Sequence, residues 1–346
     1  MEIQTNRKNN FDFIRICLAL FVFEAHLFDL HQQGQQFYFF KYISSSMAIK
    51  CFFIISGYLI TSSYYSNAFN IKQYYVNRFS RIYPAYFVVV CLSFLLFSFM
   101  SDLSLAQYFQ SINNLKYLFV NVVFLNFLQP GLEGVFEHNP IHAVNGSLWT
   151  IKIEVMFYVL LPLIVTFIHR LSLKNKLLFL GMIFFGSELY SYFFSHVIVN
   201  PIIEKQLPGH MNLFACGITC FYLRDGLKKY SKYLLLPAVV VYLLEDHFLQ
   251  VEFLKPVALS IFILFIAYNF KALNTFGKYG DFSYGIYLIH FPVIQALIEF
   301  GVFPQNPAYF LAISIVLVLV LGICSWHLVE KPSLITFKKL ANKQLR

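Results

Sequence analysis

The chain has 346 residues, of which 58% are hydrophobic and only 12% are charged. A soluble domain of this length could not bury so much apolar surface, so the composition excludes a soluble protein and predicts an all-α, polytopic integral membrane protein. The formal net charge of +9 does not indicate a nucleic-acid partner, because the Lys and Arg residues gather in short loops, where they orient membrane helices. The six cysteines lie in apolar segments without CxxC spacing, and we expect neither a disulfide nor a metal site.

Apolar segments follow one another along almost the whole chain and define the predicted topology. They lie near residues 11–29, 47–65, 82–100, 116–128, 147–168, 177–195, 210–223, 233–248, 256–270, 284–300 and 308–327. A membrane span needs about 20 residues, and the weakest candidate, 116–128, is interpreted as a re-entrant or interfacial piece of a long non-cytoplasmic excursion. The other segments then place the basic loops on one side, as the positive-inside rule requires. We therefore predict about ten transmembrane helices in one domain at 1–335, a basic tail at 336–346, and both termini in the cytoplasm.

The first apolar segment carries two residues that are poorly suited to lipid, Arg15 and His26. Eleven helical positions return them to nearly the same face, roughly 16 Å apart along the axis. A cation inside the membrane costs about 2.5 to 3.5 kcal/mol, so we expect both side chains to face protein or a polar cavity. The alternative is that Arg15 snorkels to the nearer interface and His26 is an interfacial histidine without a function.

Two further motifs precede the long excursion. Ser56 and Gly57 in FFIISGYLI permit a close helix approach or a backbone break beside a cavity, and ordinary small-residue packing is the alternative. Arg78 and Arg81 lie three residues apart on one face, just before the third apolar segment. Two guanidinium groups at this spacing suit phosphate oxygens, although they can also anchor the chain to anionic lipid head groups.

The fifth apolar segment, at 147–168, contains Glu154, with Tyr158 one turn further on the same face. A carboxylate in the membrane needs a partner or a proton. Glu154 is therefore expected to pair with Arg15 or another cation, to polarise a histidine, or to lock two helices together. His138 and His142, in the excursion before it, lack an HExxH pattern and a third ligand, so no zinc site is predicted.

Near the C-terminus, Ser283, Tyr287 and His290 are spaced i, i+4 and i+7. Hydroxyl groups and an imidazole aligned on one helix face can line a polar substrate channel, to which we also assign Tyr158 and Ser56. A structural histidine that bonds to a neighbouring helix is the alternative for His290.

Taken in order, these motifs resemble those of the acyltransferase 3 family of integral-membrane acyltransferases. The resemblance rests on RICLALFVFEAH, FFIISGYLI, RFSRIYPAYF, GSLWTIKIEVMFY and FSYGIYLIHFPV followed by VEKP, and it covers essentially the whole chain. Two positions depart from the Trp-Ser-Leu type motif, because Thr150 stands in place of the serine and Lys152 intervenes before Glu154. The chain ends at Arg346 without the C-terminal esterase-like domain of some members, and so looks like the stand-alone form.

The resemblance implies a ten-helix domain of the bacterial inner membrane that transfers acyl groups, usually acetyl, from cytoplasmic acyl-CoA to extracytoplasmic glycans. Carried over by motif, Arg15 and His26 match the essential Arg and His of the family's first helix, and Glu154 matches its acidic residue. Arg78 and Arg81 match its basic pair, the predicted CoA contacts together with Arg15. The acceptor is expected to be O-antigen, capsule, another surface polysaccharide or a lipid-linked glycan, and no metal is expected. A lipid-linked-sugar flippase or a transporter without acyl transfer is the alternative.

Overall fold

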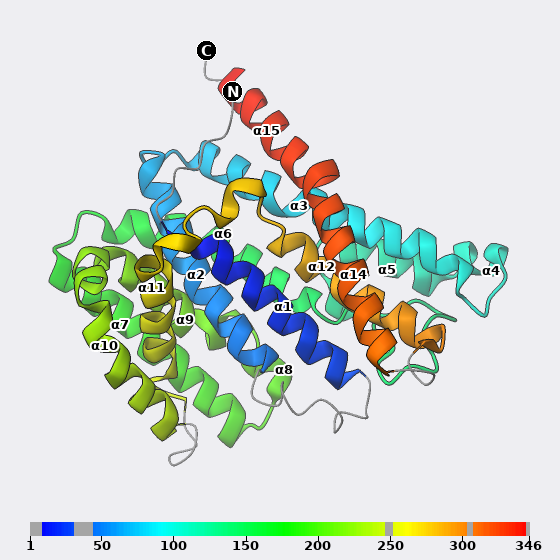
Figure 1. The fold of residues 1–346 in the computed structure, drawn as a ribbon, viewed down its shortest axis with the longest axis horizontal. Helices are drawn as coiled ribbons and strands as arrows, with labels where there is room; N and C mark the ends of the chain where they lie inside the picture. Colours follow the sequence, from blue (N-terminus) through cyan, green and yellow to red (C-terminus); the bar gives the residue numbers. More distant parts are fainter. Residues whose placement is uncertain (1–8, 31–43, 246–251, 303–306, 344–346) are drawn as a thin grey trace. The chain divides into compact units, whose positions relative to one another are not determined.

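The computed structural model describes residues 9–30, 44–245, 252–302 and 307–343 (Figure 1). These residues fold into α-helices joined by short segments, and no β-strand occurs within the described ranges. An apolar segment in lipid has no water to bond its peptide groups, so it satisfies them internally as a helix. The all-helical character predicted from composition is confirmed.

The helices have the following bounds. In chain order they are α1 (Phe11–Asp29), α2 (Ser45–Ser66), α3 (Ile71–Leu96), α4 (Leu105–Gln110), α5 (Ile112–Val122), α6 (Leu148–Ile168), α7 (Leu173–Tyr192), α8 (Pro201–Glu204), α9 (Leu207–Tyr222), α10 (Arg224–Leu244), α11 (Lys255–Asn269), α12 (Ser283–Glu299), α14 (Pro307–Ser325) and α15 (Lys331–Lys343). A π-helical turn at Trp326–Glu330 joins α14 to α15. The predicted basic tail at 336–346 therefore continues as helix up to Lys343.

The helices form two compact units, which are described separately. The first unit contains the start of α1 up to Leu18, α2, the rest of α6 from Ile153, and α7 to α11. The second contains α1 from Ala19, α3 from Tyr75, α4, α5, α12, α14 and α15. In the first unit α7 packs along α9 and α10 along α11, whereas α12 packs along α14 in the second.

Several helices meet the requirements for crossing a membrane. Among the described residues, five helical stretches are long and apolar enough: Ser45–Ser66, Ile71–Phe99, Leu148–Ile168, Leu173–Val197 and Ala308–Ala341. A sixth is reached if the pair Lys255–Asn269 and Lys271–Tyr279, bent by 77°, counts as one span. The remaining predicted crossings are shorter or more charged; α9 and α12 have 16 and 17 residues. The predicted number of about ten crossings therefore stays a prediction.

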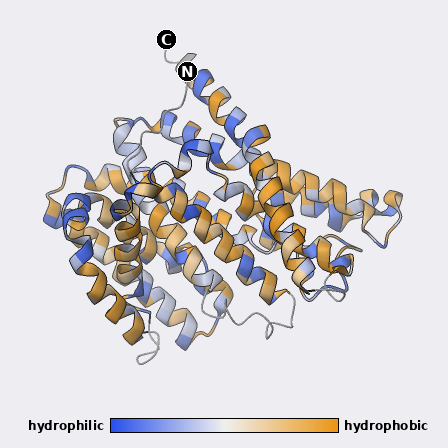
Figure 2. Cartoon of the chain, in the orientation of Figure 1, coloured by the Kyte–Doolittle hydropathy of each residue, from blue (hydrophilic) through white to orange (hydrophobic). Residues whose placement is uncertain are grey.

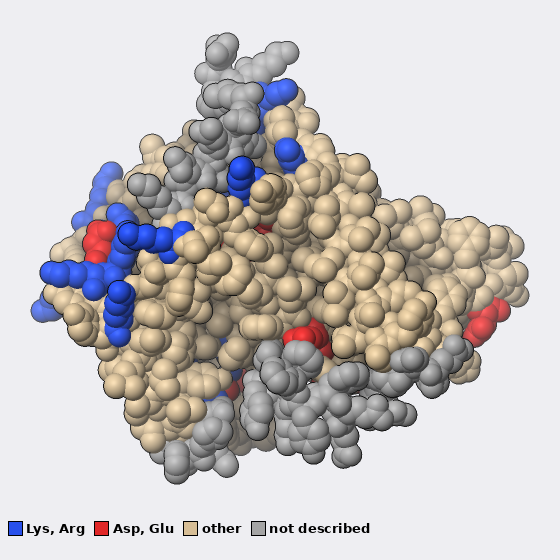
Figure 3. All heavy atoms as spheres, in the orientation of Figure 1, with Lys and Arg blue, Asp and Glu red and all other residues tan. Residues whose placement is uncertain are grey.

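Apolar side chains cover much of the helical surface. In α7, Leu178, Met182 and Leu189 are each about 60% to 70% exposed, and Figure 2 shows continuous apolar colouring along α14. The face drawn in Figure 3 is largely free of charged side chains. Exposed apolar surface of this extent marks a surface that contacts lipid.

The start of α3 differs from the sequence-based prediction. The apolar segment was expected to begin at residue 82, but the helix begins at Ile71. The side-chain oxygen of Asn70 accepts a hydrogen bond from the backbone N–H of Gln73 at 2.9 Å, which caps the new N-terminus. Arg78 and Arg81 are therefore inside the helix rather than in the loop before it. Hydropathy detects the membrane part of a helix but not its polar extension.

Small residues bring α2 and α9 into backbone contact in the first unit. A Cβ atom added to Gly57 would lie 2.4 Å from the carbonyl oxygen of Phe214, and one added to Gly217 would lie 2.1 Å from that of Ile54. Only glycine fits on both sides of such a crossing. This is the close approach expected from the FFIISGYLI motif.

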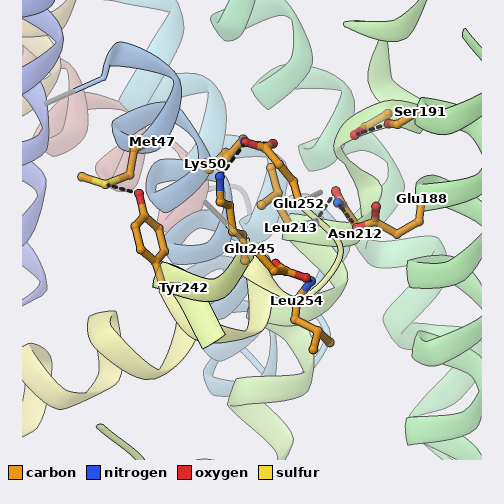
Figure 4. Close-up of polar contacts among 12 residues, drawn as sticks. Met47, Lys50, Glu188, Ser191, Asn212, Leu213, Tyr242, Glu245, Glu252 and Leu254 are labelled. Carbon is orange, nitrogen blue, oxygen red and sulfur yellow. Dashed lines mark hydrogen bonds and ion pairs between the residues drawn. The ribbon is translucent and has the colours of Figure 1, made fainter. Parts of the chain in front are cut away.

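A separate polar cluster in the first unit connects the ends of α2, α10 and α11 (Figure 4). Lys50 and Lys255 both pair with Glu252, and the buried carboxylate of Glu245 accepts the backbone N–H of Leu254 at 2.7 Å. Burial alone would raise the pKa of Glu252, but the two ammonium groups hold it below its ordinary value. The cluster ties the start of α11 to its neighbours.

Candidate functional site

Two histidines form the centre of the candidate active site in the second unit. His26 on α1 and His290 on α12 are joined by a hydrogen bond of 2.8 Å between Nδ1 of His26 and Nε2 of His290. The two rings are nearly parallel, with an interplanar angle of 4°. His290 is fully buried, whereas His26 is partly exposed. The hydrogen bond therefore fixes Nδ1 of His26, while the imidazole of His26 stays partly exposed.

Aromatic rings surround this pair. The ring of Phe291 meets His26 edge-on at 5.3 Å between centroids, and Phe23 meets His290 in the same way at 6.5 Å. Gly146 allows the chain to approach the ring of Phe291, because a Cβ atom there would lie 2.7 Å from it. An apolar wall of this kind excludes water and strengthens the polar contacts inside it.

Tyr287, one turn before His290, bonds to the residue that departs from the family motif. Its hydroxyl group lies 2.5 Å from Oγ1 of Thr150, which also donates to the carbonyl oxygen of Ser147 at 3.0 Å. Both Tyr287 and Thr150 are buried. A threonine at this position therefore keeps the hydroxyl group that a serine would supply.

Arg81 is held by two carboxylates at the start of α12 and the end of the π-helical turn. Its guanidinium group donates to Asp281 at 2.6 Å and to Glu330 at 3.1 Å. The side chains are 13%, 14% and 0% exposed, so this is a buried ion-pair cluster. The guanidinium carbon also lies 5.7 Å from the ring centre of Tyr284 and 5.6 Å from that of Trp326, within reach of cation–π attraction.

The α12 residues predicted to line a channel share one helix and are all buried. Each has a different partner: Ser283 donates to Asp281 at 2.5 Å, Tyr287 bonds to Thr150, and His290 bonds to His26. The structure thus brings His290 together with His26 but assigns Ser283 to the cluster around Arg81. Their role as a channel stays a prediction.

Glu154 lies in the first unit with two hydroxyl donors. Its Oε1 atom accepts from Ser56 Oγ at 3.1 Å and from Tyr158 OH at 2.5 Å. These three residues were all predicted site residues, and α2 and α6 bring them together. The catalytic role of Glu154 stays a prediction. Arg15 and Arg78 are half-buried, on α1 and α3.

Sequence reasoning missed the contribution of Asp281, which directly precedes the FSYG motif. It expected Glu330 only as a helix-end salt-bridge partner, without Arg81, and noted Thr150 only as a departure from the motif. The pairing with Arg81 could not be read from the sequence, because Glu330 is 249 positions away along the chain. Within the described ranges, no three His, Cys, Asp or Glu side chains are grouped so that they could hold a metal ion.

Known proteins are similar to this chain over most of its length. The sequence matches the family model described as an acyltransferase domain over residues 8–328. It is 24% identical to nodulation protein 10 of Rhizobium leguminosarum bv. viciae, covering 96% of this chain and 95% of that protein. It is 27% identical to an O-acetyl transferase of Shigella phage Sf6, covering 94% and 96%. Similarity to the O-acetyltransferase OatA of Staphylococcus aureus (strain NCTC 8325 / PS 47) is 25%, covering 83% of this chain and 52% of that protein.

No solved structure matches the chain. The family match, however, includes both histidines of the pair and Arg81 with Asp281. Because it extends over nearly all of the 346 residues, the chain belongs to the acyltransferase 3 family.

Proposed function

We propose that this protein is a membrane-bound O-acetyltransferase that moves an acetyl group from cytoplasmic acetyl-CoA to a hydroxyl group of an extracytoplasmic cell-surface glycan. Family membership establishes an acyltransferase, and the names of two relatives favour acetyl transfer to oxygen. The apolar helices favour a multi-pass protein of the bacterial inner membrane. One observation carries the choice of catalytic residue: His26 is partly exposed and its Nδ1 atom is fixed by a buried partner.

The reaction needs a base for the acceptor hydroxyl group. Neutral His26 takes the hydroxyl proton as the acceptor oxygen attacks the thioester carbonyl carbon. The C–O bond forms, the C–S bond breaks, and the proton passes from the imidazolium to the departing CoA thiolate. General-base catalysis of this kind contributes about 10²- to 10⁴-fold in rate.

A second route uses the same residue as a nucleophile. The imidazole of His26 attacks the thioester, CoA leaves as the thiolate, and the acetyl group then passes from nitrogen to the acceptor oxygen. In this route the acceptor proton passes to the CoA thiolate, which becomes the thiol, and His26 returns to the neutral imidazole. Accumulation of a labelled protein in the absence of acceptor distinguishes the two routes.

The basic residues are assigned to the donor. We place the CoA phosphates at Arg78 and Arg81 on the cytoplasmic side, with Arg15 along the path of the pantetheine arm. Along one continuous α1 helix, the axial distance from Arg15 to His26 is roughly 16 Å, a length that an extended arm has to bridge. Because Arg81 already has two carboxylate partners, phosphate would have to compete for it.

Acetyl transfer tests this proposal directly. Membranes that contain wild-type protein, His26→Ala or His196→Ala receive radiolabelled acetyl-CoA, and label is counted in the extracted surface glycan. His196 is the matched control because it is exposed and distant in sequence from the paired histidines. We expect label with wild type and with His196→Ala, and a loss of at least about 100-fold with His26→Ala at equal protein accumulation.

Two other results are informative. Equal labelling by wild type and His26→Ala would remove His26 from the chemistry. Absence of label in all three samples, with O-antigen, capsule and lipid-linked glycans each supplied, would contradict acetyl transfer and favour a lipid-linked-sugar flippase or transporter.

A further inference from the structure

The tautomer of the histidine pair can be read from its hydrogen-bond partners. Nδ1 of His290 lies 3.3 Å from the carbonyl oxygen of Ile286, one turn earlier on α12. A carbonyl oxygen only accepts, so Nδ1 of His290 is the nitrogen that carries the proton. In a neutral imidazole the other nitrogen is then a bare acceptor. Nε2 of His290 therefore presents a lone pair to His26.

The same reasoning extends to His26. Its Nδ1 atom lies 2.8 Å from the acceptor nitrogen of His290 and must supply the proton of that hydrogen bond. Neutral His26 consequently has its lone pair on Nε2. Among the described residues, no hydrogen-bonding partner for Nε2 of His26 is found. The ring thus has one nitrogen engaged and one available for chemistry.

We propose that His290 is a positioning residue that holds His26 in the Nδ1–H tautomer, through a chain of hydrogen bonds from His26 to His290 to the Ile286 carbonyl. This inference rests on the proposed function and adds to it the residue that orients the base. The reverse tautomers would place the bare Nδ1 of His290 against the Ile286 carbonyl, two acceptors without a proton between them. Because His290 is 0% exposed, no bulk water relieves that contact.

His290 also stabilises the charged form of the base without exchanging a proton. When Nε2 of His26 takes the acceptor proton, the resulting imidazolium continues to donate its Nδ1–H to His290. His290 keeps its own proton on Nδ1 throughout. The buried acid of a serine-protease triad performs the same positioning for its histidine. In this protein the neutral imidazole of His290, hydrogen-bonded to the Ile286 carbonyl, has that positioning role.

The first test measures the tautomer without reference to catalysis. Protein labelled with ¹⁵N-histidine is placed in lipid nanodiscs, and the signals of His26, one of ten histidines, are assigned by their absence in His26→Gln. We expect a protonated Nδ1 and a bare Nε2 in wild type. His290→Phe keeps a ring but removes the acceptor, so the His26 signals should shift toward the other tautomer. His290→Gln retains an acceptor oxygen near the position of Nε2 and should preserve the wild-type pattern.

The second test follows acetyl transfer by the same variants. We expect kcat to fall about 100-fold in His290→Phe with the KM for acetyl-CoA unchanged, and to stay within about tenfold of wild type in His290→Gln. Equal activity and an unchanged tautomer in His290→Phe would overturn the inference, as would equal losses in both variants when both are as well folded as wild type. If wild type shows the expected tautomer but no acetyl transfer, the proposed function fails and the hydrogen-bond assignment stands.

Discussion

Arg81 shows how the surroundings of a residue change the role that its type suggests. Two arginines three positions apart suit a phosphate group, but the guanidinium group of Arg81 already bonds to Asp281 and Glu330. Removing one member of a buried ion pair leaves the others uncompensated, at a cost of about 3 to 5 kcal/mol. Arg81 is therefore expected to contribute to the stability of the fold.

Substitution of each arginine separates binding from stability. In Arg81→Ala we expect a lower unfolding temperature, because Glu330 has no exposed side-chain surface and would keep a buried charge without its partner. In Arg78→Ala we expect a KM for acetyl-CoA raised about tenfold or more, as for one lost charge-assisted contact with phosphate. Thermal unfolding in detergent and initial rates check both. A KM effect confined to Arg81→Ala would contradict a phosphate contact at Arg78.

Candidate site residues could be predicted individually, but their pairing could not. Arg15, His26 and Glu154 stand out in the sequence because a charged or titratable residue is expensive in a membrane segment. Arg78 and Arg81 stand out because their spacing suits phosphate oxygens. Their partners are not visible. His290 lies 264 positions from His26, and helix periodicity contains no information about which faces of two distant helices meet.

Among the elements, α2 and α9 make the contact that is most sensitive to side-chain volume. At this crossing Gly57 and Gly217 each face the backbone of the other helix, so an added methyl group has no flexible neighbour to displace. Ser56, the residue before Gly57, donates to Glu154. A change in the crossing would therefore disturb a predicted catalytic residue as well as the packing.

Gly57→Ala tests this contact against a matched glycine. We expect the substitution to lower stability by about 1 to 3 kcal/mol through overpacking, and to reduce acetyl transfer through Glu154. Gly181→Ala is the control, since Gly181 on α7 has no neighbouring atom within 4 Å of an added Cβ, and alanine favours the helix. Thermal unfolding measures the stability of both variants. Equal stabilities would show that the crossing relaxes without cost.

Helix boundaries were predicted best where hydropathy changes abruptly. The first segment was expected at 11–29 and α1 is Phe11–Asp29, whereas α3 begins eleven residues before its apolar segment because Asn70 caps a polar extension. The capping side chain is a local signal, but an asparagine in a loop has many other uses. Hydropathy alone therefore locates the membrane-facing part of a helix and does not detect a polar extension of it.

At the scale of the whole molecule, the topology determines from which side each substrate arrives. Lys and Arg residues at 169–176 and 224–232 are expected in the cytoplasm, and the excursion at 101–146 is expected outside. Under the proposed function, this predicted arrangement would give CoA access from the cytoplasm and glycan access from the opposite side. Both access routes require that the chain crosses the membrane an odd number of times between residues 101–146 and each of the two basic regions.

Accessibility of single cysteines checks that requirement. In a variant whose six native cysteines are replaced by alanine, we introduce Glu137→Cys or Lys174→Cys, two positions that are exposed in the structure. A membrane-impermeant maleimide should label Glu137→Cys in spheroplasts, because the excursion that contains it is predicted to lie outside. It should label Lys174→Cys only after permeabilisation, because moving the basic loop across the membrane opposes the positive-inside preference. Labelling of both positions in intact spheroplasts would place the loop between α6 and α7 outside, and the path proposed for acetyl-CoA would then have no cytoplasmic entrance.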